Sequence, residues 1–550
     1  MNNPILKNKF YLYLTEFFAG MSVMAVELGA SRLLAPYFSS SQIVWTIIIG
    51  TIMIAMALGN IMGGRWADKN PNPDKLYGRI IIAAIWIALI PVVGKYIVIG
   101  ISALLVFTIS TNFLVIAAFA ACMIVFVFPL FLLGTVTPSL VKYTVDSLDD
   151  SGKVVGYLNA SNTIGSIIGT FVPTFISIPA VGTSITFLIF AGILLALAIV
   201  YFIAGKKRSV KAVVGAILFL ISCIFGHGDS FAFWQHDLTY EGESIYNYLQ
   251  VYEDDSKVVL STNVLFGVQS VYRKEKTLTG MYYDYAMAAP YMSGLEEKNI
   301  KMLILGMGTG TYATQCKRYF DGIEVEGVEI DQKITDLAHT YFELPEDVKV
   351  TTYDGRAYLE ALSSESKHKT YDISKEQADN LKYDVIMVDA YQDITIPFQM
   401  SSVEFFTLVK NQLKDDGVMV VNMNIKSDGE DGAGINEYLA DTISQVFSEV
   451  YTVDVPNNTN RELFASNNSS MVGMFRAGYM SEDDMELHDM MDQLYGHLQR
   501  YDAGDNILTD DKAPVELLSM QAIDALIRDE VDYYKDIYDR EGLQGLLDSF

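Results

Sequence analysis

The sequence predicts a multi-pass α-helical membrane domain followed by a soluble α/β domain of the Rossmann-like type, with a small antiparallel β-sheet between them. The net charge changes sign near residue 228: residues 1–228 hold 14 Lys and Arg against 7 Asp and Glu, whereas the remainder holds 25 against 59. Long apolar runs fill the first part, and from residue 301 strand and helix patterns alternate around a glycine-rich turn. The 550 residues also exceed the usual size of one domain.

Residues 1–228 are predicted to form the transmembrane domain, because a spanning helix needs about 20 consecutive apolar residues. About seven spans are expected, near residues 10–34, 43–64, 79–108, 113–141, 154–178, 183–204 and 210–226. No cleavable signal peptide is expected, since the first apolar run is long and no small-residue cleavage site follows it.

Basic residues predict the orientation of the spans, because they favour the cytoplasmic side. Lys95 and Arg32 lie toward one side, and twelve basic residues lie in the segments that would share the other: Lys7, Lys9, Arg65, Lys69, Lys75, Arg79, Lys142, Lys153, Lys206, Lys207, Arg208 and Lys211. The N-terminus of this cell-membrane protein is therefore expected in the cytoplasm. The soluble domain is extracytoplasmic if residues 210–226 span, which we favour, and cytoplasmic if they lie along the interface.

Two acidic residues in the first span raise the alternative of transport. Glu16 and Glu27 are three helical turns apart and share a helix face. Charges at this depth usually face a bundle interior or a cavity. They either line a cation path or pair structurally with Arg32 or with polar residues such as Asn60 and Asn162.

Two short motifs accompany these spans. The segment GGRWADKNPNPDK (63–75) is similar to the loop between the second and third spans of major facilitator transporters. The segment GSIIG (165–169) is a small-xxx-small pattern, which predicts close packing of two membrane helices.

The acidic second part argues against nucleic acid as a partner, because phosphates require a basic face. It suits a cationic small molecule, although a solvated acidic surface that keeps the domain soluble is the explanation we favour. The six His and three Cys residues show no metal-ligand or disulfide spacing, so no metal is expected.

The soluble part divides into two predicted regions. Short alternating runs in residues 229–300 predict a small antiparallel sheet that would bind substrate. Residues 301–550 predict a nucleoside-binding, doubly wound parallel sheet. Its five predicted strands are KMLILGM, IEVEGVEI, VKVTTYD, YDVIMVDAY and GVMVVNMN.

Ligands of such sheets bind at the carboxyl ends of the strands. Glu329 is placed to accept hydrogen bonds from ribose hydroxyls, and Asp354 from an adenine amino group. Acidic side chains without a phosphate-loop lysine suit a cationic nucleoside, either S-adenosylmethionine or its decarboxylated form. The residues at these strand ends are Gly306, Gly308, Gly310, Glu329, Asp331, Asp354, Gly355 and Asp389.

From about 240 to 425 the sequence resembles the polyamine aminopropyltransferase (spermidine synthase) family, most closely its membrane-fused bacterial branch. The motifs that carry the resemblance are ESIYNYLQV, FGVQS, YYDYAMAAPYM, the glycine loop, VEID, YDGRAYL and YDVIMVDAYQDITIPFQMSSVEFF, with LTDDKAPVE near the end. The family implies a fold of the S-adenosylmethionine-methyltransferase type, polyamine biosynthesis as the activity, and a homodimer as the assembly.

The resemblance also implies roles for individual residues. Asp389 would be the catalytic carboxylate that accepts a proton from the attacking amine. Gln269 and Tyr282 would line the donor pocket with the glycine loop and Glu329, Asp331, Asp354 and Gly355. The acceptor amine would lie against Tyr246, Tyr283, Asp284, Tyr391 and Asp393.

The sequence departs from the family pattern at three positions. Thr309 stands where soluble members have an Asp that favours the decarboxylated donor, Asn247 stands for a Gln, and Asp393 is displaced by one residue from the Asp-x-x-Asp spacing. Three functions therefore stay open: aminopropyl transfer to a diamine such as putrescine, another use of S-adenosylmethionine such as methyl transfer or cofactor cleavage, and a non-catalytic polyamine or nucleoside sensor or transporter.

Overall fold

The computed structural model describes most of the chain: residues 3–38, 41–106, 109, 112–144, 151–228, 230–235, 237–264, 268–295, 299–369, 382–390, 396–423, 434–456 and 458–548. It forms two compact units. The helical unit comprises Met1–His236 with Glu241–Tyr248 and Asn263–Leu265, and the α/β unit comprises Asp237–Tyr240, Leu249–Thr262 and Phe266–Phe550.

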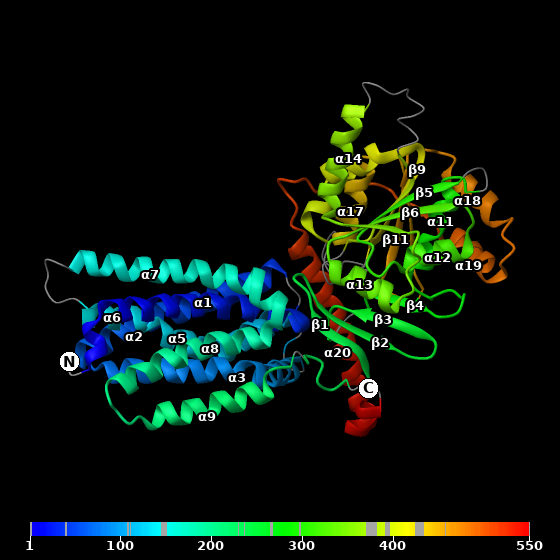
Figure 1. The fold of residues 1–550 in the computed structure, drawn as a ribbon. Helices are drawn as coiled ribbons and strands as arrows, with labels where there is room; N and C mark the ends of the chain where they lie inside the picture. The colour runs from blue at the N-terminus through cyan, green and yellow to red at the C-terminus, as the bar shows by residue number, and fades with distance from the viewer. Residues whose placement is uncertain are drawn as a thin grey trace. The chain divides into compact units, whose positions relative to one another are not determined.

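The helical unit consists of apolar helices that follow one another with short connections (Figure 1). After a 3-10 turn at Pro4–Lys7, the helices are α1 (Lys9–Phe38), α2 (Gln42–Lys69), α3 (Pro73–Val106), α4 (Phe113–Val125), α5 (Val127–Gly134), α6 (Val136–Thr144), α7 (Ser151–Val172), a π-helical turn η2 (Pro173–Ser177), α8 (Ile178–Ala204) and α9 (Val210–Phe225).

Five helical stretches in the described residues are long and apolar enough to cross a membrane, as a membrane domain requires. They are Lys9–Phe38, Gln42–Lys69, Pro73–Leu105, Val127–Thr144 and Ser151–Ala204. The last has 54 residues, well beyond one bilayer thickness, and its direction changes at Gly182, where φ is 80°. Two shorter apolar helices are also present: α4 lies in the first part of the expected fourth span, 113–141, and α9 lies at the expected seventh span, 210–226.

The expected single span at 113–141 is interrupted in the structure. Phe126 separates α4 from α5, and Thr135 separates α5 from α6. The Thr135 hydroxyl donates to the Leu132 carbonyl at 2.7 Å, one turn earlier. Hydroxyl groups that bond to the preceding turn compete with the backbone ladder and bend helices, a local effect that hydropathy does not report.

Helices α1 and α7 approach each other closely at two glycines of the GSIIG motif, as that motif predicts. A Cβ at Gly165 would lie 2.0 Å from the Phe17 carbonyl oxygen, and one at Gly169 would lie 2.1 Å from that of Met21. Figure 1 shows α7 lying along α1. Only glycine permits this separation, so the two backbones pack directly against each other.

Glu16 is completely buried where α1, α6 and α7 meet. Its Oε1 accepts hydrogen bonds from the Thr137 hydroxyl at 2.5 Å and from the Asn162 amide at 2.8 Å. The other oxygen, Oε2, has no partner among the described residues. Arg32, the other partner considered for Glu16, instead donates to the carbonyl oxygens of Ser244 and Ile245 within the same unit. The structure therefore supports the polar pairing with Asn162.

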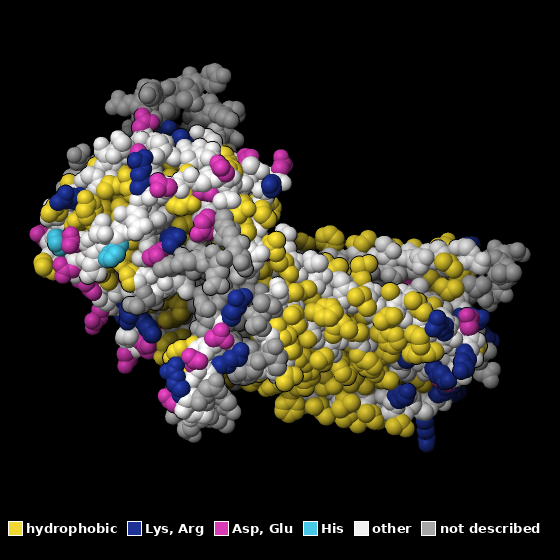
Figure 2. Space-filling model, turned by 180° about the vertical axis from the view of Figure 1, so that it is seen from behind, with side chains coloured by type: hydrophobic (Ala, Val, Ile, Leu, Met, Phe, Trp, Pro, Cys, Tyr) yellow, Lys and Arg dark blue, Asp and Glu magenta, His cyan; other side chains and the backbone are white. Residues whose placement is uncertain are grey.

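The surface of the helical unit separates apolar flanks from a basic end. Figure 2 shows continuous hydrophobic side chains over the flanks and Lys and Arg side chains gathered at one end. Within the helical unit, Lys142 forms an ion pair with Asp68 at 2.9 Å, and Lys207 forms one with Asp74 at 2.6 Å. This distribution is typical of a protein whose flanks face lipid and whose end faces water.

The small sheet has four strands, and their order along the chain is also their order in space. The strands are β1 (Leu238–Glu243), β2 (Tyr248–Glu253), β3 (Lys257–Ser261) and β4 (Ser270–Arg273), followed by the short helices α10 (Tyr282–Ala286) and α11 (Ala288–Met292). Leu249, Val258 and Leu260 of the small sheet pack against Leu337 and Phe342 of the following domain.

The large sheet has eight strands in the order β12-β10-β11-β9-β8-β5-β6-β7. Its parallel strands are β5 (Ile300–Leu305), β6 (Ile323–Glu329), β7 (Lys349–Thr352), β8 (Tyr383–Val388) and β9 (Leu413–Met423), as the alternation of strands and helices predicts. The antiparallel strands β10 (Glu449–Asp454), β11 (Arg461–Ser466) and β12 (Gln499–Arg500), which the sequence analysis did not predict, extend the sheet beyond these five strands.

Helices cover both faces of the large sheet in Figure 1. On one face, Val385, Met387, Val418, Val420 and Phe464 pack with α10 and α11 in a single buried cluster. The helices of the domain are α12 (Thr311–Tyr319), α13 (Gln332–Tyr341), α14 (Gly355–Lys369), a 3-10 turn (Phe398–Met400), α16 (Val403–Gln412), α17 (Ile435–Ser444), α18 (Met471–Tyr479), α19 (Met485–His497) and α20 (Val515–Asp548).

Candidate active site

The glycine loop connects three strand ends. Gly306 has φ of 80°, and a Cβ there would lie 2.6 Å from the Asp389 carbonyl oxygen, so the position requires glycine. The Gly306 N–H donates to Val328 of β6 at 2.9 Å, and the Asp389 N–H donates to Leu305 of β5 at 2.9 Å. Gly308 and Gly310 also have positive φ, and Gly310 caps α12. The loop, Glu329 and Asp389 are thereby held at one edge of the sheet.

Glu329 ends β6 and is buried against the glycine loop. Its Oε2 accepts from the Gly308 N–H at 2.8 Å, and its Oε1 accepts from the Asp331 N–H at 2.9 Å. Each carboxylate oxygen can accept a second hydrogen bond, as a ribose hydroxyl would require. Burial raises the pKa of Glu329 to about 7, although both N–H donors lower it. Asp331 is buried and caps α13 by accepting from the Lys333 N–H at 3.0 Å.

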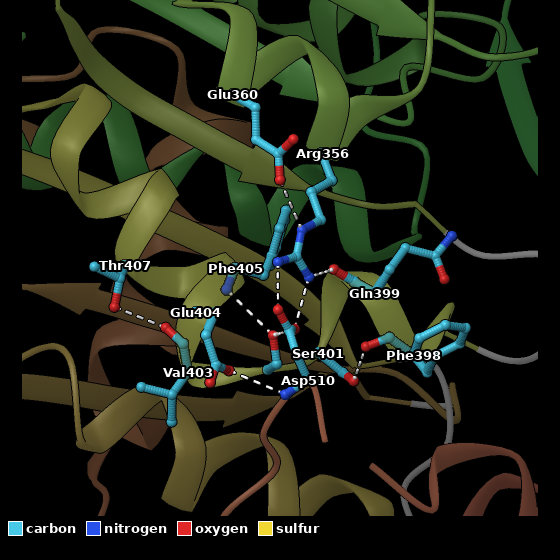
Figure 3. Close-up of polar contacts among 11 residues, drawn as sticks. Arg356, Glu360, Phe398, Gln399, Ser401, Val403, Glu404, Phe405, Thr407 and Asp510 are labelled. Atoms are coloured by element: carbon cyan, nitrogen blue, oxygen red, sulfur yellow. Dashed lines mark hydrogen bonds and ion pairs between the residues drawn. The ribbon is translucent and has the colours of Figure 1, made fainter. Parts of the chain in front are cut away.

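Asp354 and Gly355 form the turn from β7 into α14, where Asp354 accepts from the Ala357 N–H at 2.8 Å. The next residue, Arg356, fixes this turn to the C-terminal segment. Its two terminal nitrogens donate to the two carboxylate oxygens of Asp510 at 2.7 and 2.6 Å, and one of them also donates to the Gln399 carbonyl at 3.0 Å (Figure 3). A bidentate pair of this kind positions groups firmly.

Asp389 follows β8 directly and is bonded by two donors. The Tyr282 hydroxyl donates to Oδ2 at 2.5 Å, and the Asn422 amide donates to Oδ1 at 2.9 Å. Burial raises the pKa of Asp389 to about 7, and these two hydrogen bonds oppose that rise. The carboxyl group therefore changes its charge near neutral pH, which is where a general base works best.

Other predicted site residues surround Tyr282. The Tyr282 and Tyr283 rings have centroids 4.0 Å apart, and the Tyr283 hydroxyl donates to the Gln269 carbonyl at 2.9 Å. Asp284 is buried and accepts from the Gly280 N–H at 2.7 Å and the Gln315 amide at 3.3 Å. Asp284 therefore fixes the start of α10 beside α12.

Four residues with a predicted role are placed differently or lie outside the description. Tyr246 is 38% exposed in the turn between β1 and β2, among the residues that belong to the helical unit. Thr309 is fully buried, with its hydroxyl 3.3 Å from that of Thr311. Tyr391 and Asp393 lie outside the described residues.

The sequence analysis missed three residues beside Asp389. Asn422 lies near the end of β9, and its side-chain oxygen accepts from the side-chain amide of Asn460, the second of these residues, at 2.8 Å. Glu462, on β11, is fully buried. Asn422 could have been found, because it lies close to the end of a predicted strand. Glu462 carried one signal, an acid within the apolar run RELFAS, but β11 itself was not predicted.

The arrangement combines the predicted nucleoside cradle with an ionisable carboxyl group. The cradle is formed by Gly306, Gly308 and Glu329, and Asp389 lies beside it at the end of the adjacent strand. Among the described residues, no group of three or more His, Cys, Asp and Glu is placed to hold a metal ion. The arrangement suits a cationic donor and an amine that must lose a proton before it reacts.

Comparison with known proteins identifies the family of the α/β domain. Residues 282–471 match the family model of the spermine/spermidine synthase domain. The chain is 50% identical over 366 residues to a probable polyamine aminopropyl transferase of Bifidobacterium longum. The matched region covers 64% of this chain and 77% of that protein. It is 24% identical over 242 residues to the polyamine aminopropyltransferase of Vibrio vulnificus, covering 43% of this chain and 74% of the other.

Solved structures give a weaker likeness. A spermidine synthase in complex with the transition-state analogue AdoDATO is 19% identical, with a TM-score of 0.34, and covers 47% of this chain and 87% of its own. Human methyltransferase-like protein 13 in complex with SAH is 19% identical, with a TM-score of 0.29. The match covers 39% of this chain and 88% of the methyltransferase-like protein.

Proposed function

Because the chain belongs to the polyamine aminopropyltransferase family, we propose that it transfers an aminopropyl group from decarboxylated S-adenosylmethionine to a small amine such as putrescine. The observation that carries this proposal is the Asp389 carboxyl group, which has a pKa of about 7 and accepts from Tyr282 and Asn422 at the edge of a nucleoside cradle. The enzyme is then a spermidine synthase-like transferase of polyamine biosynthesis.

Asp389 prepares the acceptor for attack. An alkylamine has a pKa near 10 and is mostly protonated at neutral pH, so it cannot act as a nucleophile. The Asp389 carboxylate takes one proton from the ammonium group and leaves a neutral amine. The amine nitrogen forms a bond to the aminopropyl carbon, the bond from that carbon to sulfur breaks, and its electron pair stays on sulfur. The new secondary ammonium keeps the positive charge.

The donor supplies the electrophilic carbon beside its sulfonium, and residues of the chain hold the rest of it. Glu329 accepts from the ribose hydroxyls, Asp354 accepts from the adenine amino group, and Gly306 and Gly308 let the backbone approach the nucleoside. Gln269 and Tyr282 line the side where the transferred chain lies. These roles require no metal ion.

A second candidate is supported by Thr309. An uncharged, fully buried side chain here removes an acid that would favour the decarboxylated donor. Another S-adenosylmethionine-dependent transfer or cleavage would then use the same cradle. A charged contact contributes about 1–3 kcal/mol. Because Thr309 cannot make such a contact with the decarboxylated donor, we expect the two forms of the donor to bind within about tenfold of each other. Thr309→Asp should raise the preference for the decarboxylated form, as calorimetry would measure.

The experiment that tests the proposal is mass spectrometry of the purified protein incubated with putrescine and either form of the donor. Formation of spermidine from the decarboxylated form supports aminopropyl transfer. A methylated amine or a cleaved donor would instead favour the second candidate. No product with any amine would contradict both and leave a sensor or transporter.

We also propose that the twelve basic residues of the helical unit face the cytoplasm and that α9 (Val210–Phe225) spans the membrane, so that the α/β unit is extracytoplasmic. The charge distribution along the chain supports this orientation. A reporter enzyme that works only outside the cytoplasm should be active when it is fused after Phe550. A cytoplasmic signal would show that α9 lies along the interface, and the donor would then reach the site without crossing a membrane.

A further inference from the structure

Three polar side chains form one row across adjacent strands at the candidate active site. Val388 of β8 is paired with Val421 of β9, which places Asp389 at the level of Asn422. Asn422 is paired directly with Glu462 of β11. Because paired residues point to the same face of a sheet, Asp389, Asn422 and Glu462 share one face and one level.

Asp389 and Asn422 are bonded within this row, but Glu462 is not. Both Glu462 carboxyl oxygens are buried without a hydrogen-bond partner among the described residues, and its side chain is 0% exposed. An unpartnered buried carboxyl group costs several kcal/mol if it is charged and is normally avoided. A partner for Glu462 is therefore expected when the enzyme is at work, and a bound ligand could provide it.

The charges around Glu462 indicate that it lacks a positively charged partner. Burial, and then the negative charge of Asp389, raise the pKa of Glu462 well above its usual range. Among the described residues, the pKa of Tyr312 of α12 also responds to the charge of Glu462, and Tyr312 carries no positive charge. A neutral Glu462 can ionise only when a cation arrives, since an opposite charge favours the ionised form of a carboxyl group.

We infer that Glu462 supplies the second negative charge of the acceptor site and thereby selects diamines over monoamines. A diamine carries two positive charges, and Asp389 compensates only the one on the nitrogen that reacts. The inference rests on the proposed function, because Asp389 is taken as the group that meets the reacting nitrogen. The distal ammonium group is compensated by Glu462, which releases its proton to the solvent as the diamine binds.

Turnover with 1,4-diaminobutane and with 1-aminobutane tests this inference. Glu462→Gln keeps the shape and removes the ionisable group, so kcat/KM with the diamine should fall about ten- to hundredfold, the usual value of a charged contact. The monoamine should react equally well with both proteins. Glu462→Asp should restore part of the preference. Glu326→Gln is a matched control, because Glu326 lies on β6 and binds the Tyr383 hydroxyl.

A binding measurement separates this inference from the proposed function. Calorimetry at pH 8, in buffers of different ionisation enthalpy, should show release of about one proton when 1,4-diaminobutane binds, because Asp389 is already mostly ionised at that pH. Glu462→Gln should abolish the release. An absence of aminopropyl transfer with this release intact would overturn the proposed function alone. Equal binding of the two amines without proton release, or no binding of either, would overturn the inference.

Discussion

The hydrogen bond from Tyr282 to Asp389 gives a prediction about the pH dependence of turnover. Tyr282→Phe removes the hydroxyl group that donates to Asp389 at 2.5 Å and lowers the pKa of Asp389. A hydrogen bond to a charged group contributes about 1.5–3 kcal/mol, and one pKa unit corresponds to about 1.4 kcal/mol. The variant should therefore raise the pKa of Asp389 from about 7 by about one to two units.

The sign follows from the role of Asp389 as a base, which requires its ionised form. Turnover should rise with pH through about 7 in the wild type and through about 8 to 9 in Tyr282→Phe. At pH 7 the variant should be about 5- to 50-fold slower, and the difference should shrink at alkaline pH. The assay is the pH profile of kcat at saturating donor.

The neighbouring tyrosine provides the control for this experiment. Tyr283 belongs to the same helix, but its hydroxyl donates to the Gln269 carbonyl at 2.9 Å and not to Asp389. Tyr283→Phe should leave the acidic limb of the profile at its wild-type position. If Tyr282→Phe lowered kcat equally at every pH, the hydroxyl would not act through the charge of Asp389 and the reasoning would be refuted.

Asp389→Asn should lower turnover at least about a hundredfold, the scale of a lost general base, while donor affinity measured by calorimetry changes little; full turnover would exclude Asp389 as the base. Glu329→Ala should weaken donor binding by about 1.5–3 kcal/mol, because it removes a charged acceptor; unchanged affinity would contradict its place at the ribose. Gly165→Ala should lower the thermal stability of the helical unit in detergent, because its Cβ would lie 2.0 Å from the Phe17 carbonyl oxygen, whereas Gly156→Ala in the same helix meets open space and should have no effect.

The placement of most residues of the proposed nucleoside cradle could be predicted from the sequence, because they follow apolar strands that alternate with helices. The structure places Gly306, Glu329 and Asp389 at strand ends on one edge of the sheet, as this pattern predicts. The antiparallel edge could not be predicted in the same way, since β10 and β11 are short and follow the last clear strand–helix repeat. Glu462 was missed because its importance depends on pairing with β9, a contact between strands that are distant in sequence.

In the helical unit, too, the sequence predicted the main elements but not every local irregularity. Hydropathy located the apolar stretches, because the length of a span is set by the bilayer. It also separated the spans 154–178 and 183–204 on either side of the break at Gly182. It did not locate the interruptions at Phe126 and Thr135, which depend on local backbone geometry and on hydroxyl groups that bond within their own helix. The GSIIG motif was interpreted correctly, because direct contact between backbones requires small residues at that spacing.

The ion pair between Arg356 and Asp510 has a consequence for biosynthesis. The turn at Asp354 and Gly355 is made early, but the carboxylate that fixes it is made roughly 150 residues later. At about 5–20 residues per second, the ribosome needs about 8 to 30 seconds for that distance. For most of this interval the nascent chain already carries its glycine loop and Asp389 but not the contact that fixes the turn at Asp354 and Gly355. If the proposed donor site is correct, the α/β unit should acquire its affinity for the donor only after Asp510 has been made.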